Sequence, residues 1–240
     1  MFGKCQEVCA DVQLREHCER LGLFGQHQHG FRRSRSTTTA LLTAVIRWRE
    51  SKLKKKHQAA LFFDLSAAYD VLDRNLFLQK AEICGISGSA LKWLQSYLSN
   101  RSQIVQIGQE FSSELSLDTG TPQGSSCSCL VFILFVGDLP QWVGEGLLVA
   151  YADDVFVTVE ADSESELREK LEKEGEKILQ YFASNLLVAN PSKTALVVFS
   201  SRSQVEHEPF HITLAGECII ETSEEKVLGI AVQNDLKSTN

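Results

Sequence analysis

The apolar residues of the chain follow two spacings, one typical of helices and one typical of strands. Apolar positions three and four apart predict helices at 38–55, 75–83, 89–98 and 165–186. Alternating or unbroken short apolar runs predict strands at 59–65, 103–107, 114–117, 147–151, 155–159, 195–199, 211–215 and 226–232. The apolar stretch at 130–139 suits either form, and we favour a helix. Helices mixed with antiparallel hairpins indicate an α+β fold with helices packed on one face of a sheet.

The two longest predicted helices each carry an apolar stripe that we expect to face the core. In the helix at 38–55 the stripe consists of Leu41, Leu42, Val45, Trp48 and Leu53. In the helix at 165–186 it consists of Leu167, Leu171, Ile178, Phe182 and Leu186. Gly175 weakens this second helix, because glycine is a poor helix former.

Length and composition are those of an ordinary globular protein. The chain has 240 residues, enough for one large or two small domains, and 43% of them are hydrophobic and 23% charged. No apolar stretch reaches the roughly 18–20 residues of a membrane span, and no signal-peptide pattern opens the chain. We therefore expect a soluble intracellular protein with no membrane partner. The sequence distinguishes neither cytoplasm from nucleus nor one oligomeric state from another.

The seven cysteines are odd in number and irregularly spaced, which predicts free thiols in a reducing compartment. A zinc site built from Cys5, Cys9, His17 and Cys18 is an alternative. These residues lack the repeated pairs that bracket a tight turn in structural zinc sites, so structural cysteines are favoured.

The net charge of −7 conceals two runs of opposite sign. Between positions 31 and 57, nine Lys and Arg residues are opposed by one Glu. Between positions 160 and 176, eight Asp and Glu residues are opposed by three Lys and Arg residues. A solvated helix face explains the acidic run best, whereas for the basic run this explanation and a phosphate-binding surface are equally open.

Two groups of carboxylates end predicted strands far apart in the sequence. Asp64 follows two phenylalanines, and Asp153 and Asp154 lie in the predicted hairpin at 147–159. Carboxylates that converge require neutralisation, and divalent cations provide it through oxygen ligands. Two such cations about 3.5–4 Å apart catalyse displacement at phosphorus. Each group taken alone has a structural explanation, as a turn former or a helix cap.

Five blocks resemble the motifs of reverse transcriptases and occur in the same order. They are FFDLSAAYD (62–70), GTPQGSSCS (120–128), YADD (151–154), NPSKT (190–194) and KVLGI (226–230). The stretches QHGFRRSRSTTTALL from Gln28 and LKWLQSYLSNRSQIVQI from Leu91 are similar to those of non-LTR, LINE-type retrotransposons. The resemblance covers nearly the whole chain.

This resemblance implies the fingers and palm of a right-hand polymerase with an antiparallel palm sheet. The fingers would comprise about 1–60 and 74–118, and the palm about 61–73 and 119–240. The implied activity is RNA-directed DNA synthesis by two-metal nucleotidyl transfer. Its partners would be an RNA template, a DNA primer and deoxynucleoside triphosphates, and its cofactors two Mg²⁺ ions, for which Mn²⁺ can substitute.

Carried over residue by residue, the resemblance assigns a role to each of thirteen positions. The catalytic acids would be Asp64, Asp153 and Asp154. The metal ligands would be Asp64, Asp153 and the backbone of Leu65. The nucleotide would contact Tyr69, which blocks a ribose 2′-hydroxyl, together with Gln123, Gly124 and Lys193. The template and primer would contact Arg32, Arg33, Arg35, Leu228 and Gly229, with support from the lysines at 52–56.

The chain departs from the family's pattern at several positions. Ala67, Gly137, Val227 and the Cys127–Cys129 triplet replace the residues most members carry there, and none of them removes a metal ligand. The upstream arginine block and the thumb are not found, so we expect a fragment that extends a primer poorly. A relic that binds nucleic acid without synthesis is an alternative, and another two-metal enzyme such as a nuclease is a second.

Overall fold

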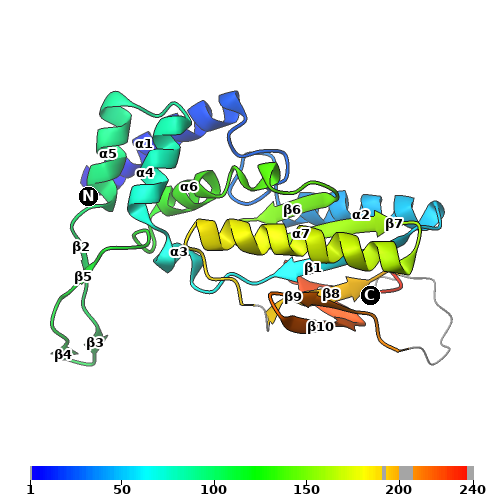
Figure 1. The fold of residues 1–240 in the computed structure, drawn as a ribbon. Helices are drawn as coiled ribbons and strands as arrows, with labels where there is room; N and C mark the ends of the chain where they lie inside the picture. The colour runs from blue at the N-terminus through cyan, green and yellow to red at the C-terminus, as the bar shows by residue number, and fades with distance from the viewer. Residues whose placement is uncertain (1, 191–192, 200–207, 237–240) are drawn as a thin grey trace.

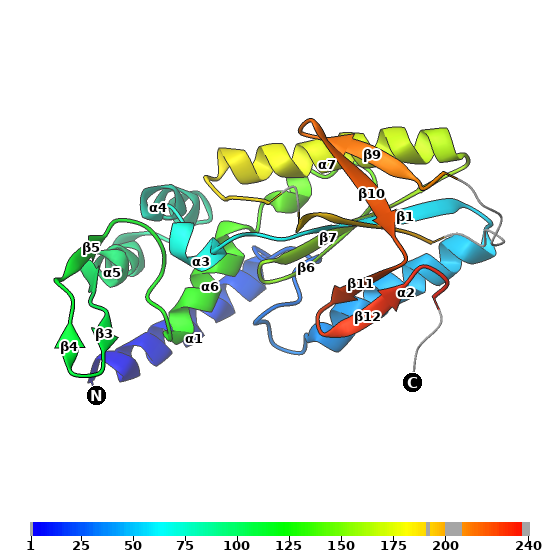
Figure 2. The ribbon, with the colours of Figure 1, turned by 90° about the horizontal axis from the view of Figure 1, so that it is seen from below.

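A six-stranded sheet forms the centre of the structure, and a group of helices extends from one of its ends (Figures 1 and 2). This computed structural model describes residues 2–190, 193–199 and 208–236, so Pro191 and Ser192 of the NPSKT block lie outside the described residues. The strands follow the spatial order β6 (Leu147–Tyr151), β7 (Asp154–Ala161), β1 (His57–Phe63), β8 (Ala195–Val198), β10 (Glu217–Thr222) and β9 (His211–Leu214). Neighbouring strands are antiparallel except β8 and β10.

Strand β1 is apolar on both sides and lies in the interior of the sheet. Its register with β7 pairs Phe63 with Val155 at one end and His57 with Ala161 at the other. Ala59, Leu61 and Phe63 face one core cluster, and Ala60 and Phe62 face a second cluster on the opposite side. A strand buried on both faces requires cover on both faces.

Two long helices and a hairpin provide this cover (Figure 2). Helix α7 (Glu164–Ser184) packs on one face, and helix α2 (Thr37–Leu53) packs on the other. The hairpin of β11 (Glu224–Val227) and β12 (Ile230–Gln233) joins α2 through Val227 and Val232 in the second core cluster. The expected α+β fold is confirmed, but helices cover both faces of the sheet rather than the one face that we expected. The reason is that the unbroken apolar pattern of β1 requires cover on both faces.

The helical group contains five α-helices and one 3₁₀ turn (Figure 1). They are α1 (Phe2–Leu21), α3 (Ala68–Val71), α4 (Arg74–Ile83), α5 (Gly88–Leu98), α6 (Ser126–Phe135) and the 3₁₀ turn η1 (Leu139–Gln141). Helix α6 is almost entirely buried, which confirms the helix favoured for the apolar stretch there. Helix α1 was not predicted, because its apolar residues do not gather on one side of the helix, and it packs against α6.

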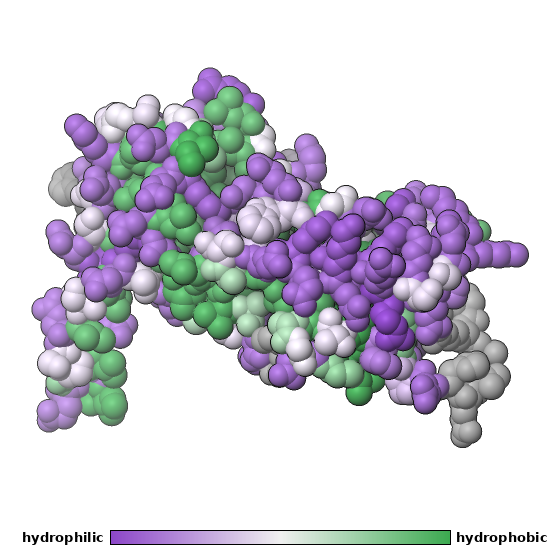
Figure 3. Space-filling view, in the orientation of Figure 1, coloured by the Kyte–Doolittle hydropathy of each residue, from purple (hydrophilic) through white to green (hydrophobic). Residues whose placement is uncertain are grey.

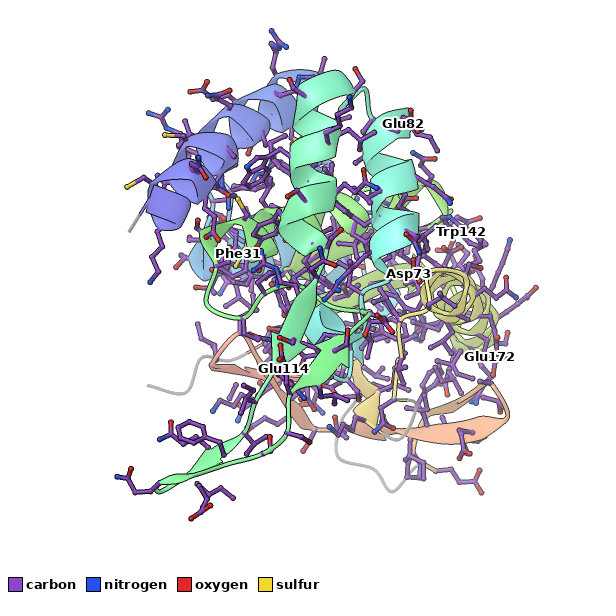
Figure 4. All side chains as sticks on the ribbon, turned by 90° about the vertical axis from the view of Figure 1, so that its left-hand side faces the viewer. Phe31, Asp73, Glu82, Glu114, Trp142 and Glu172 are labelled. Atoms are coloured by element: carbon purple, nitrogen blue, oxygen red, sulfur yellow. The ribbon has the colours of Figure 1, made fainter. Side chains whose placement is uncertain are left out.

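A β-ribbon extends away from the helices (Figure 4, where Glu114 lies on it). Strand β2 (Arg101–Gln103) pairs with β5 (Leu115–Leu117), and β3 (Gln106–Ile107) pairs with β4 (Glu110–Phe111). The predicted antiparallel return is confirmed, with an additional short hairpin at its end. Apolar side chains are exposed on the ribbon, and its lower part is correspondingly green in Figure 3.

Several core and strand predictions were wrong. Leu42, Leu53 and Leu186 are 55%, 84% and 58% exposed. Leu42 lies on the solvent side of α2, Leu53 is its last residue, and Leu186 lies beyond the end of α7. The predicted strand at 226–232 is instead a hairpin that turns at Leu228 and Gly229. Both turn residues have positive φ, a conformation that glycine accepts at low cost. Strand β10 was not predicted, because its residues do not alternate clearly between apolar and polar.

The acidic run forms a large part of the hydrophilic surface of α7 (Figure 3) and also makes backbone contacts. Glu172 accepts a hydrogen bond from the N–H of Thr213, and Glu176 accepts one from that of Ala215. The first of these N–H groups lies in strand β9 at the edge of the sheet, and the second lies on the residue that follows the strand. Free edge N–H groups invite pairing with other chains, so the two glutamates protect this edge.

The seven cysteines are free thiols, as predicted. Cys18 and Cys127 are buried, whereas Cys5, Cys9 and Cys218 are exposed. Within the described ranges, no helix is long and apolar enough to span a membrane.

Gly175 lies where α7 approaches the sheet most closely. A Cβ atom added there would lie 2.7 Å from Cδ2 of Leu214 and 3.3 Å from Cδ1 of Leu61, both fully buried. The glycine that weakens the helix in the sequence therefore allows the helix to pack on β9 and β1.

We expect Gly175→Ala to lower the free energy of unfolding by about 1 kcal/mol, because an overpacking cost of roughly 1–3 kcal/mol outweighs a helix-propensity gain of about 1 kcal/mol. Urea denaturation measures this change. Gln180→Ala on the exposed face of α7 is the control and should not destabilise. In a Leu214→Ala background the cost of Gly175→Ala should disappear, and a cost that persists there would contradict this packing explanation.

Candidate active site

The β6–β7 hairpin presents two aspartates at its turn. Tyr151 pairs with Asp154, so Ala152 and Asp153 form the tip. Ala152 has a φ of 58°, in the left-handed region that an alanine rarely adopts. The turn is therefore held in a specific conformation by its surroundings rather than by its own sequence.

Asp64 lies beside this turn because of the register of β1. The last residue of the strand, Phe63, pairs with Val155, so the chain reaches Asp64 next to Asp154. Burial raises the pKa of Asp153, and the charge of Asp64 raises it further. A hydrogen bond from the backbone N–H of Asp153 to its own carboxylate acts in the opposite direction and lowers this pKa in part. Burial also raises the pKa of Asp154, followed by the charges of Asp153 and Asp64. The structure thus brings the three predicted acids together.

Lys193 is the closest cation to these acids in the described part of the chain. Its Nζ lies 3.2 Å from Oδ2 of Asp64. The chain before it is fixed next to β1, because Ser66 N–H donates to Val188 and Asn190 N–H donates to Asp64. These two bonds flank Leu65, whose own carbonyl is thereby directed away from the 188–190 segment.

An open cleft of about 290 Å³ joins several of the predicted site residues. Asp64 and Asp154 line it together with Lys193, and the turn at Leu228 closes its other side. Asp64 and Lys193 are 47% and 61% exposed at their side chains, so both can reach a ligand. The sequence blocks at 62–70, 151–154, 190–194 and 226–230 therefore meet at one place.

The loop at 120–124 is joined directly to the block at 62–70. Gly120 N–H donates to Leu72, and Thr121 N–H donates to Tyr69. A Cβ atom at Gly120 would lie 2.6 Å from the carbonyl oxygen of Asp70, so only glycine fits this position. Gln123 Nε2 donates to Oδ1 of Asp70 at 2.7 Å, which fixes the direction of the glutamine side chain.

Arg74 is a buried residue of this loop junction that the sequence did not reveal. Its guanidinium donates to the carbonyls of Leu117, Thr119 and Gly120. The neighbouring Asp73, labelled in Figure 4, caps α4 through Leu76 N–H. An arginine in the first turn of a polar helix suggests a surface residue, so no sequence signal distinguishes it.

Tyr69 lies between this loop and the aspartate turn. Its ring packs against Phe132 at a centroid distance of 4.7 Å. Burial raises its pKa, as do the nearby Cys129 thiol and the Asp153 carboxylate. Its hydroxyl lies next to the Cys129 thiol, and Gly124, with a φ of 75°, has open space around it. Tyr69 therefore lies between the loop that carries Gln123 and Gly124 and the turn that carries Asp153.

The three arginines predicted to contact nucleic acid differ in how far the rest of the chain engages them. Arg32 has a side chain only 9% exposed and binds Glu19 through two nitrogens at 2.9 and 2.6 Å. Arg35 donates to the backbone and side chain of Gln26. Only Arg33 of the three is exposed. A guanidinium engaged by carboxylate and carbonyl oxygens is not available for phosphate, so Arg32 supports the fold instead.

Part of the basic run pairs with the acidic run. Arg47 lies 3.0 Å from Glu160, and Lys56 forms an ion pair with Asp162. Lys52 donates to the carbonyl of Asp235. The two runs are far apart in sequence, but β1 and β7 bring their ends together.

Comparison with known proteins identifies the family. The family model described as reverse transcriptase (RNA-dependent DNA polymerase) matches residues 3–232. The chain belongs to the reverse transcriptase family. This reverse transcriptase chain is 26% identical over 203 residues to the probable RNA-directed DNA polymerase from transposon X-element of Drosophila melanogaster. It is 25% identical over 217 residues to the probable RNA-directed DNA polymerase from transposon BS of the same species.

These relatives agree with the resemblance to non-LTR retrotransposons. The matched parts cover 83% and 88% of this reverse transcriptase chain but only 22% and 24% of the relatives. In fold it is similar to telomerase from Candida albicans, with a TM-score of 0.65 at 16% identity, over 95% of this chain and 37% of that one. For a truncated apo telomerase from Candida tropicalis the TM-score is 0.68 at 14% identity, over 97% of this chain and 45% of that one. The fingers and palm architecture is thus confirmed.

The raised pKa values of Asp153 and Asp154 predict how the site affects stability. A carboxylate whose pKa is higher in the folded than in the unfolded state favours folding at acid pH, and this contribution is lost as the pH rises through the folded-state value. At neutral pH without divalent cations, both aspartates should therefore destabilise the protein. We expect Asp153→Asn to raise its melting temperature and Asp154→Asn to raise it less, because Asp154 is exposed and solvent screens its charge.

The control is Asp162→Asn, because its pKa is lowered by the hydrogen bond from Lys56. This change should not raise the melting temperature. Thermal unfolding at pH 7 in EDTA, repeated at pH 4, measures the three variants. The gain from Asp153→Asn should shrink at the lower pH, and an unchanged gain would show that desolvated charge is not its source.

Proposed function

We propose that the chain carries the polymerase site of an RNA-directed DNA polymerase that extends a DNA primer on an RNA template with deoxynucleoside triphosphates. The observation that carries this proposal is the meeting of Asp64 with Asp153 and Asp154 where β1 and the β6–β7 hairpin end together. The fingers would comprise about 1–60 and 74–118, and the palm about 61–73 and 119–240.

Two divalent cations fit the chemistry of this site. The described residues contain no group of three His, Cys, Asp or Glu side chains that could hold a metal ion alone. Mg²⁺ is commonly bound through one or two carboxylates, with substrate phosphates and water completing its shell. Asp64 and Asp153, with the carbonyl of Leu65 and Asp154 alongside, would hold Mg²⁺ or Mn²⁺ in this way. Bound cations would supply neutralisation of the reacting phosphate and activation of the primer hydroxyl.

The reaction exchanges one phosphorus–oxygen bond for another. The primer 3′-oxygen bonds to the α-phosphorus, its proton is lost, and the bond to the β-phosphate breaks so that pyrophosphate leaves. Lys193 would meet the charge of this pyrophosphate, because its ammonium group is exposed beside Asp64. If the Lys193 ammonium group moves from Asp64 to the pyrophosphate, it exchanges one anionic partner for another.

The remaining site residues would orient the nucleotide and the primer. Asp70 holds Gln123, and open space surrounds Gly124, so this loop would contact the incoming nucleotide through its backbone. Leu228 and Gly229 would direct the primer end into the cleft that Leu228 lines. Arg33 would contact backbone phosphates.

Asp153→Asn should lower primer extension by roughly 100- to 1,000-fold, the scale seen when one group that stabilises a transition-state charge is removed. The measurement is extension of a DNA primer on RNA by the intact protein with Mg²⁺, and Asp162→Asn is the control. A wild-type protein that binds primer and template without extending them would indicate a relic, and full activity of Asp153→Asn would remove Asp153 from the site.

Tyr69→Ala should reduce the preference for deoxynucleotides over ribonucleotides by roughly 10–200-fold, the range that one steric difference in a pocket provides. Tyr69→Phe is the matched control, because it keeps the ring, and the ring alone would exclude a 2′-hydroxyl. Competition between the two nucleotide classes measures the preference. An unchanged preference in Tyr69→Ala would place Tyr69 outside the sugar pocket.

A further inference from the structure

The segment at 27–29 runs beside the hairpin that carries Asp153. Ala150 N–H donates to the carbonyl of His27 at 2.9 Å, and His29 N–H donates to the carbonyl of Ala150 at 2.7 Å. Gln28 therefore forms a parallel bridge with Ala150 at the free edge of β6. This pairing brings the Gln28 side chain to the turn two residues farther along, although 124 positions separate Gln28 from Ala152 in the sequence.

The Gln28 side chain is fully buried and contacts both backbone polar groups of Ala152. Its Oε1 accepts from the N–H of Ala152 at 2.9 Å and from the N–H of Gly30 at 2.7 Å. Its Nε2 donates to the carbonyl of Ala152 at 3.5 Å, the long limit of a hydrogen bond. Ala152 is itself buried, so without Gln28 its N–H would lose the partner that burial requires.

Gly30 fixes the same turn by its lack of a side chain. A Cβ atom at Gly30 would lie 2.4 Å from the backbone nitrogen of Ala152 and 3.0 Å from Oε1 of Gln28. The segment can approach the turn this closely only because position 30 is glycine.

The opposite side of Gln28 is anchored to the helical group. Arg32 donates to the carbonyl of Gln28 at 3.2 Å and to that of Gly25, and Glu19 of α1 holds Arg32 through two contacts. A continuous series of hydrogen bonds thus runs from α1 through Arg32 and Gln28 to Ala152, the residue before Asp153.

We propose that Gln28 is a positioning residue for the catalytic turn, which it acts on through the backbone of Ala152 to fix the direction of Asp153. This inference rests on the proposed function of Asp153 and adds a role for the QHG sequence at 28–30. The left-handed conformation of Ala152 is unfavourable for alanine, so an external constraint is needed to keep it. Gln28 supplies that constraint at both the N–H and the carbonyl of Ala152, that is, at the two peptide units that flank its Cα.

The test compares Gln28→Met, which keeps the length of the side chain and removes its polar atoms, with a matched control. Gln58→Met is that control: Gln58 is also a buried glutamine, it lies near the far end of β1, and it donates to the carbonyl of Trp48 at 2.7 Å. Both variants should lose thermal stability. Only Gln28→Met should increase hydrogen exchange at the amides of 151–155, a readout that does not depend on activity.

Primer extension by the intact protein supplies the second readout. Gln28→Met should lower kcat by on the order of a hundredfold, since a misplacement of about 1 Å has an effect of that size. It should also raise the Mg²⁺ concentration needed for half-maximal activity, with primer–template affinity unchanged. Gln28→Glu retains an acceptor for Ala152 N–H, so its kcat should be at least tenfold higher than that of Gln28→Met.

The outcomes separate this inference from the proposed function. A wild-type protein that carries this chain together with its flanking segments and has no polymerase activity would refute the function, and hydrogen exchange would still test Gln28. Unchanged exchange at 151–155 in Gln28→Met, or equal changes in exchange and Mg²⁺ dependence in Gln58→Met, would overturn the positioning role. Increased exchange at these amides in a Gly30→Ala variant would support it through an independent contact.

Discussion

The antiparallel pairing of β1 with β7 is the constraint on which the rest of the structure depends. Its register places Phe63 opposite Val155, and so brings Asp64 to the turn that holds Asp153 and Asp154. A shift of one residue would also turn Leu61 and Phe62 to the wrong cores, because strand side chains alternate between faces. The same apolar residues that stabilise the sheet therefore determine where the acids meet, and the packing of α7 and α2 on its two faces locks this register.

Bringing three carboxylates together opposes folding, and the structure offsets this cost with rigid backbone contacts around them. Burial and mutual charge raise the pKa of Asp153 and Asp154, while Lys193 lies next to Asp64. The loop at 120–124 is held by Asp70 and Arg74, and the aspartate turn is held by Gln28. Under the proposed function, a site that accepts cations and phosphates would keep charge that a purely structural core would exclude.

The charged residues show how tertiary contacts change the meaning of a sequence pattern. Arg32 looks like a phosphate-binding residue in the sequence, but Glu19 and backbone carbonyls occupy its guanidinium. The ends of the basic and acidic runs neutralise each other through Arg47 and Lys56, and the acidic helix protects a sheet edge through Glu172 and Glu176. A net charge of −7 is thus compatible with a nucleic-acid-binding family, because many charges serve internal contacts.

The sequence by itself determined the family, the α+β class and the acids, because periodic apolar runs and short ordered motifs are local properties of the chain. It also predicted helix α6 and the β6–β7 hairpin from runs of neighbouring residues. Tertiary structure decided which faces of the sheet are covered, why Gly175 is tolerated in α7, and which charged side chains remain free. It alone connected Gln28 to Ala152 and Arg74 to Gly120. Such contacts join residues far apart in the chain, and their partners are set by the packing of whole elements, which no local pattern encodes.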